Sequence, residues 1–165
     1  MFELKPISRE AIPEALEKAE RYRLLNEPSQ AESICLDVLR VDPGNQRATI
    51  MLLLALTDQL GSGVTVVRAR EVLPNIRDDY ERHYYAGIVC ERWAKAQLRK
   101  GAPGSGFNAY DTFCEAMRHY EEAEAVRPAG NDDAILRWNT CARILMRNPD
   151  LRQRPAEPFE PVLDD

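Results

Sequence analysis

The sequence predicts an all-α protein built from pairs of helices, with no β-sheet. Apolar residues recur at the i, i+3, i+4, i+7 spacing of amphipathic helices along most of the 165 residues, and no convincing strand-like alternation is present. Glycine, proline and asparagine clusters interrupt this periodicity at short intervals. The helical pattern also repeats every 34 residues, which is typical of stacked helix pairs.

Seven helices are expected between these breaks. Pro13 suits the first turn of the first helix, where a missing N–H costs nothing. Asn45 is placed to cap the third helix, and residues 131–133 to open the seventh. Thr112 and Glu115 have the spacing of a capping box, so the sixth helix is expected to begin near Thr112. The expected helices cover approximately residues 11–25, 27–41, 46–60, 64–73, 78–100, 112–126 and 131–147.

Two segments lack a periodic apolar face. Residues 101–106 read GAPGSG and are expected to form a flexible break. Residues 148–165 contain four prolines, and we expect a disordered, Pro-rich acidic tail. Its deletion should change stability by less than about 1 kcal/mol.

Composition and charge exclude several classes of function. The net charge of −5 disfavours a general nucleic-acid binder, and the longest apolar run, residues 50–56, is too short to span a membrane. The first sixteen residues are charged and broken by prolines, unlike a secretory signal. The four cysteines form no CxxC pair and lie in apolar helical patterns, so we expect reduced packing residues. We expect a cytoplasmic protein with no cofactor and with neither nucleic acid nor membrane as partner.

Frames that begin at Ile12, Gln46 and Tyr80, 34 residues apart, align equivalent positions without a gap. A small-residue site and a larger site three positions later recur in the first helix of each frame, at Ala19 and Tyr22, Leu53 and Leu56, and Gly87 and Cys90. The second helix has its best counterparts at Ala31, Cys35, Val38 and Pro43, and at Ala116, Tyr120, Ala123 and Pro128. This arrangement resembles the tetratricopeptide repeat, whose pattern is W-x2-L-G-x2-Y, then A-x3-F, then P.

The resemblance implies a tetratricopeptide-like α-solenoid of about three helix pairs plus a C-terminal capping helix. The repeats would cover approximately residues 12–45, 46–79 and 80–130, and the cap residues 131–147, within one domain of residues 1–147. Cys90 and Ala116 lie 26 positions apart where the family pattern expects nine, so about seventeen residues are inserted near 91–110. An irregular helical bundle is the alternative.

In this family, partners usually lie in a concave surface lined by the first helix of each pair. Repeat one would contribute Leu16, Glu20 and Arg23 to that surface. Repeats two and three would contribute Arg47, Ile50, Leu54, Asp58, Glu81, Tyr84, Ile88, Glu91 and Arg92. The alternative for Ile50, Leu54 and Ile88 is a place in the core. We expect Tyr84 and Arg92 to be the main anchors, because tyrosine and arginine dominate binding hot spots.

Some family members bind the acidic C-terminus of heat-shock chaperones through lysine, asparagine and arginine. The corresponding sites here hold Leu16, Glu20, Met51, Glu81 and Tyr85, so that clamp is not expected. Arg92, Lys95 and Arg99 form a basic row along the fifth helix, which usually marks a solvated face.

Candidates for chemistry are few. His83 and His119 each follow a carboxylate by four positions, namely Asp79 and Glu115. Such pairs can ligate a metal or orient a general base, but they more often form a surface pair worth a few tenths of a kcal/mol. No GxSxG, HExxH or phosphate-binding GKT or GKS motif occurs, so no catalytic, cofactor or metal residue is assigned.

These inferences favour a non-enzymatic protein–protein interaction module, a scaffold or adaptor that binds a peptide or helix in its concave surface. One alternative is a helical regulatory subunit of an enzyme. Another is a structural homo-oligomer that uses the insertion near 91–113 as its contact, where Trp93 and Phe107 could form an apolar patch.

Overall fold

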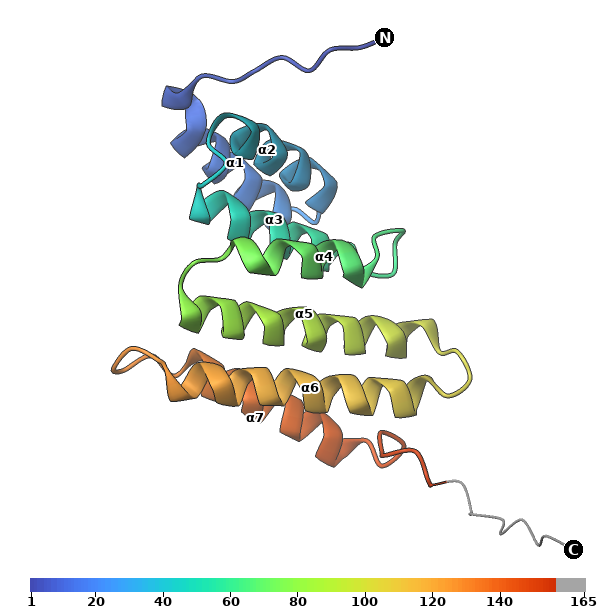
Figure 1. Ribbon diagram of the computed structural model, residues 1–165. Helices are drawn as coiled ribbons and strands as arrows, with labels where there is room; N and C mark the ends of the chain where they lie inside the picture. Colours follow the sequence, from blue (N-terminus) through green and yellow to red (C-terminus); the bar gives the residue numbers. More distant parts are fainter. Residues whose placement is uncertain (157–165) are drawn as a thin grey trace, which may run out of the picture.

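Seven α-helices stack in chain order in the computed structural model, which describes residues 1–156 (Figure 1). They are α1 (Ile12–Leu24), α2 (Pro28–Val41), α3 (Gln46–Asp58), α4 (Val66–Val72), α5 (Asp79–Lys100), α6 (Ser105–Ala125) and α7 (Asp133–Arg147). Two short 3-10 turns, η1 (Arg9–Ala11) and η2 (Leu73–Asn75), precede α1 and follow α4. Within residues 1–156 there is no β-strand, so the predicted all-helical fold of seven helices is confirmed there.

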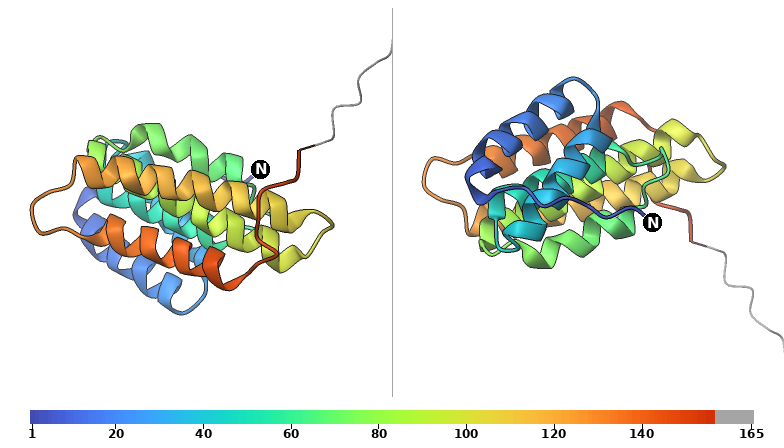
Figure 2. Two further views of the ribbon diagram at one scale, coloured as in Figure 1. Left: turned by 90° about the horizontal axis from the view of Figure 1, so that it is seen from below. Right: turned by 90° about the horizontal axis from the view of Figure 1, so that it is seen from above.

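The helices run roughly along a common direction when the stack is viewed from either end (Figure 2). Neighbours in the chain pack together, and α3 contacts α1, α2, α4 and α5. This position explains why α3 is apolar on nearly all sides, since a helix with neighbours all around it buries most of its surface. No helix among the described residues is long and apolar enough to cross a membrane.

Local sequence signals fix most helix ends as predicted. The Asn45 side chain accepts a hydrogen bond from the backbone N–H of Ala48 at 2.9 Å and caps α3. Asp78 caps α5 in the same way, through the backbone N–H of Glu81 at 2.8 Å. Pro13 lies in the first turn of α1, as expected.

The start of α6 was predicted wrongly. The helix begins at Ser105, and Thr112 lies inside it, where its hydroxyl donates to the carbonyl of Asn108 at 2.8 Å. Gly101 and Gly104 both adopt positive φ and close a tight turn, so the expected flexible break is only a few residues long. The added residues of the third frame therefore extend both α5 and α6 into a long hairpin.

Two hydrophobic clusters form the core. One involves α1 to α4 together with Val89 of α5, and the other joins α5, α6 and α7. Leu54 and Tyr85 are half-buried and contact both clusters, so they link the two parts of the stack. Cys35, Cys90 and Cys141 are buried free thiols, as predicted, whereas Cys114 is half-buried.

Helices α5 and α6 pack tightly where Gly87 of α5 faces Tyr120 of α6. A Cβ atom at position 87 would lie 2.4 Å from Cε1 of the Tyr120 ring. The residue on α5 must therefore lack a side chain, and the fully buried ring fills the space that this leaves. A small residue opposite a large one is what the repeat pattern predicts at these two positions.

The first residues of the tail depart from expectation. Leu151 is buried and packs against the second cluster, beside Gly106 at the start of α6. A search for helical periodicity cannot detect a single anchoring side chain after a helix end. Residues 152–156 are exposed, although the Arg154 guanidinium lies 5.3 Å from the ring centroid of Phe107. The rest of the predicted tail, residues 157–165, lies outside the described residues.

The first prediction concerns the contact between α5 and α6. Gly87→Ala should destabilise the protein by about 2 kcal/mol, because overpacking against a buried ring outweighs the usual preference of helices for alanine. Chemical denaturation measures the change. Gly44→Ala is the matched control, since its new Cβ would meet only the flexible end of Arg77, and it should change stability by less than about 0.5 kcal/mol. Equal effects of the two substitutions would contradict the steric explanation.

The second prediction separates the two parts of the tail. Leu151→Ala should cost about 2 kcal/mol, the lower end of the range for buried leucines. Removal of residues 152–165 should cost less than about 1 kcal/mol, since an exposed cation–π contact is worth no more than that. Thermal unfolding compares both with Leu136→Ala, an exposed leucine of α7 whose loss should have little effect. A truncation as damaging as Leu151→Ala would show that more of the tail docks than Leu151.

Candidate functional site

A polar cleft of about 470 Å³ lies across the odd-numbered helices of the stack. Its walls come mainly from α1, α3, α5 and α7, which are the first helix of each expected pair and the expected cap. We call it the central cleft. Its lining residues are Glu20, Arg23, Leu24, Asn26, Pro28, Thr57, Asp58, Glu91, Arg92, Lys95, Arg99 and Arg137.

A second cleft of about 410 Å³ shares Glu20 and Arg23 with the central cleft and therefore adjoins it. We call it the α3 cleft, because most of its further lining belongs to α3. Those further residues are Gln46, Arg47, Ile50, Met51, Leu54, Glu81 and Tyr85. The two clefts differ in character, since apolar side chains contribute much of the α3 cleft and charged side chains most of the central cleft.

Most of the predicted contact residues line one of these clefts. Arg47, Ile50, Leu54 and Glu81 line the α3 cleft, and Asp58, Glu91 and Arg92 line the central cleft. Ile50 and Leu54 are half-buried and also pack against the core, so the core alternative holds in part and their contact with a partner stays a prediction.

Ile88 and Tyr84 do not line either cleft. Ile88 is only 2 % exposed, so a direct contact with a partner is excluded and the core alternative holds. Tyr84 is half-buried in an aromatic cluster, with its ring centroid 5.8 Å from that of Tyr80 and 6.0 Å from that of Tyr120. The helical spacing placed these residues on the correct helix. Successive positions on a helix point in different directions, so an error of one position decides whether a side chain faces the cleft or the core.

Asp58 of α3 forms ion pairs that connect α3 to α1 and α5. Its carboxylate accepts hydrogen bonds from Arg23 of α1, at 2.6 and 3.3 Å, and from Arg92 of α5. Arg92 also donates to the Thr57 hydroxyl at 2.9 Å. Charge-assisted hydrogen bonds among residues that line the central cleft thus join three helices that are not all adjacent in the chain.

Glu91 is a fully buried carboxylate where α5, α6 and α7 meet. It accepts hydrogen bonds from the Tyr120 hydroxyl at 2.7 Å, Lys95 at 2.5 Å and Arg137 at 3.3 Å. Burial alone raises the pKa of this carboxyl. The hydrogen bonds from Lys95 and Tyr120 and the positive charges of Lys95 and Arg137 outweigh burial, so the pKa of Glu91 lies below its ordinary value.

The central cleft carries an excess of positive charge although the whole chain is acidic. Five cationic and three anionic side chains line it, whereas the net charge of the chain is −5. Arg99 forms no ion pair within residues 1–156 and is exposed. The cleft is therefore suited to a ligand that brings at least one negative charge.

Sequence reasoning missed part of this site. Lys95 and Arg99 were recognised as a basic row, but a solvated face was the preferred interpretation. Arg137 belongs to the helix predicted to be only a cap. It enters the cleft because α7 packs on α6 and its Arg137 side chain reaches Glu91 of α5. No spacing in the sequence connects residues 46 positions apart, so this contribution required the tertiary structure.

The third prediction tests the charge of Glu91. Glu91→Gln should destabilise the protein by about 3 kcal/mol at pH 7, because Lys95 and Arg137 lose the anion that compensates their partial burial. Folding lowers the pKa of Glu91. The ionised carboxylate therefore contributes its full stabilisation of the fold above the ordinary glutamate pKa of 4.5, and this contribution is lost as the pH falls through the lower pKa of the folded state.

Urea denaturation at a series of pH values therefore distinguishes this charge effect from simple packing. The difference between the parent and Glu91→Gln should shrink below about pH 4.5. The exposed Glu17→Gln on α1 is the control and should show no such difference at any pH. A difference for Glu91→Gln that stays constant down to about pH 3 would rule out an ionised Glu91.

Comparison with known proteins assigns no family to the chain. No protein-family model, no curated protein and no solved structure matches it. The tetratricopeptide resemblance therefore rests on the residues and spacings of this sequence and stays a prediction.

Proposed function

We propose that this protein is a non-enzymatic interaction module, a scaffold or adaptor with a tetratricopeptide-like arrangement of helix pairs. The observation that carries the proposal is the position of the two adjoining clefts. They run across α1, α3 and α5, the helices whose counterparts hold partners in the resembled family. The contact between Gly87 and Tyr120 supports the same arrangement, because it matches the small and large sites of the third repeat.

The ligand is a peptide or a short helix with mixed anchors. An apolar side chain fits beside Ile50, Leu54 and Tyr85 in the α3 cleft. An acidic side chain fits near Arg92 and Arg99 in the central cleft. A polyanion fits poorly, because four of the five cations that line the central cleft are already paired with Asp58 or Glu91.

The cytoplasm is the compartment that we propose. Cys35, Cys90 and Cys141 are buried as free thiols, and no disulfide forms within residues 1–156. Buried free thiols of this kind are typical of proteins that work in a reducing compartment.

The fourth prediction tests the central cleft. A pull-down from native lysate with the full chain as bait, followed by mass identification, supplies the partner. Replacement of both Arg92 and Arg99 by alanine should then weaken its binding by about 2 kcal/mol, or about 30-fold. Asp58 keeps Arg23 as its partner in this variant, so the helical circular dichroism signal should be retained.

The matched control is the double variant Arg118→Ala with Arg143→Ala. Both arginines are exposed on α6 and α7, form no ion pair among the described residues and line neither cleft. The control loses the same charge and should bind the partner like the parent. Equal affinity of the cleft variant and the parent would refute the proposal, as would association of the chain only with itself in light scattering.

A further inference from the structure

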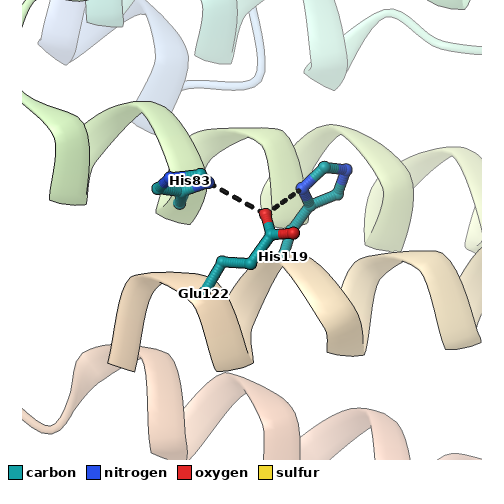
Figure 3. A group of neighbouring side chains, drawn as sticks. All are labelled: His83, His119 and Glu122. Carbon is teal, nitrogen blue, oxygen red and sulfur yellow. Dashed lines mark hydrogen bonds and ion pairs between the residues drawn. The ribbon is translucent and has the colours of Figure 1, made fainter. Parts of the chain in front are cut away.

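The only two histidines of the chain meet at one carboxylate on the outer side of the α5–α6 hairpin. Glu122 lies between the imidazole rings of His83 and His119, as Figure 3 shows. Its Oε2 is 2.9 Å from Nδ1 of His83 and 3.3 Å from Nδ1 of His119. The histidines are 36 positions apart in the sequence, so the packing of α6 on α5 brings them together.

We propose that His83, His119 and Glu122 form a binding site for a divalent transition-metal ion of the Zn²⁺ type. Two imidazole nitrogens and one carboxylate oxygen are a ligand set that zinc uses, with a water molecule in the fourth position. Hard ions such as Mg²⁺ prefer oxygen ligands alone, so the two nitrogens favour zinc and its neighbours over them.

The distances suit such an ion without movement of the backbone. Zinc binds imidazole nitrogen and carboxylate oxygen at about 2.0 to 2.2 Å, which places tetrahedral ligand atoms about 3.4 Å apart. All three ligand atoms lie within 4.8 Å of one another, and both contacts of Glu122 are within a few tenths of an ångström of the tetrahedral spacing. Small rotations of exposed side chains complete the geometry.

Glu115 lies near the second nitrogen of His119, where zinc-binding histidines usually have a supporting carboxylate. Its Oε1 lies 4.0 Å from Nε2 of His119, the nitrogen that faces away from Glu122, and its Oε2 lies 3.7 Å from Nη2 of Arg70 on α4. A carboxylate on the far nitrogen orients the ring and directs the other nitrogen to the ion. At 4.0 Å this contact is longer than a hydrogen bond, and a small rotation of the Glu115 side chain closes it. Glu115, which forms an ion pair with Arg70, is therefore assigned as a positioning residue.

A competing ligand set, Cys90 with Glu115 and His119, is less accessible. Cys90 is only 3 % exposed, whereas the side chains of His83, His119 and Glu122 are 36, 30 and 54 % exposed. An ion from solvent reaches the histidine pair directly, but it would have to enter the core to reach the thiol.

The metal site is separate from the proposed peptide site. His83 lies two positions from both Glu81 and Tyr85, which is roughly half a helical turn, so it faces away from the α3 cleft. An ion that bridges α5 and α6 would stabilise the hairpin that also holds Glu91, because it binds the folded chain and not the unfolded one. The inference does not depend on the proposed function.

The experiment uses the full chain without a polyhistidine tag, after treatment with a chelator. Titration with zinc sulfate in a calorimeter should show one ion per chain, and zinc should raise the midpoint of thermal unfolding. Magnesium chloride should do neither. In the NMR spectrum of the unaltered chain, the imidazole signals of both histidines should shift together as zinc is added, a readout that needs no variant.

Variants then test the ligands. His83→Asn and Glu122→Gln should each weaken zinc binding by at least about 100-fold, and Glu115→Gln by about 10-fold, since outer partners typically contribute 10- to 100-fold. The matched control is Glu124→Gln, an exposed glutamate on α6 outside the cluster, which should bind zinc like the parent.

Four results would each overturn the proposal. The first is the absence of zinc binding at one ion per chain, and the second is a zinc-dependent shift of the NMR signals of only one histidine. The third is zinc binding that survives His83→Asn and is lost in Cys90→Ala. The fourth is magnesium binding with the same affinity as zinc.

Discussion

The packing of α5 against α6 at Gly87 is the constraint on which both candidate sites depend. Because position 87 has no side chain, the Tyr120 ring lies directly against α5. The same approach places the Tyr120 hydroxyl 2.7 Å from Glu91 on one side of the hairpin. On the outer side it places His119 and Glu122 within reach of His83. A wider separation of the two helices would break both the hydrogen bond between Tyr120 and Glu91 and the contact between Glu122 and His83.

Glu91 shows how a costly group is retained in a core. A buried carboxylate is unfavourable unless charged donors surround it, and hydrogen bonds from α5, α6 and α7 meet this requirement. The network joins α7 to the hairpin with a fixed rotation, because Arg137 must point at the carboxylate. The same rotation brings a positive charge to the central cleft. One group of side chains thus holds α7 in place and also lines the central cleft.

Asp58 is a second carboxylate that joins helices through charged hydrogen bonds. It joins α1, α3 and α5 through two arginines, while Leu54 and Tyr85 connect the two hydrophobic clusters. The α3 cleft lies at this junction, because Leu54 and Tyr85 both line it. Ligand sites are common where packed units meet, because the helices there are held in place while their side chains remain accessible.

The sequence by itself determined the helical class, the number of helices and most of their ends. These features depend on interactions within a few residues, such as the Asn45 cap and the proline in the first turn of α1. Where a local signal competed with tertiary packing, packing decided. The capping-box spacing at Thr112 had no effect, because the preceding turn of α6 packs on α5 and extends the helix back to Ser105.

Only the tertiary structure decided which side chains meet. Glu91, Tyr120 and Arg137 come from three helices and are separated by 29 and 46 positions. The two histidines were paired in sequence with Asp79 and Glu115 of their own helices. The carboxylate they share, Glu122, lies on α6 with His119 and reaches His83 across the interface with α5. Such convergence depends on the distance and rotation between helices, which side chains such as Gly87 and Tyr120 set jointly. Periodicity along one helix specifies which face is buried, but not which residue of a neighbouring helix that face will contact.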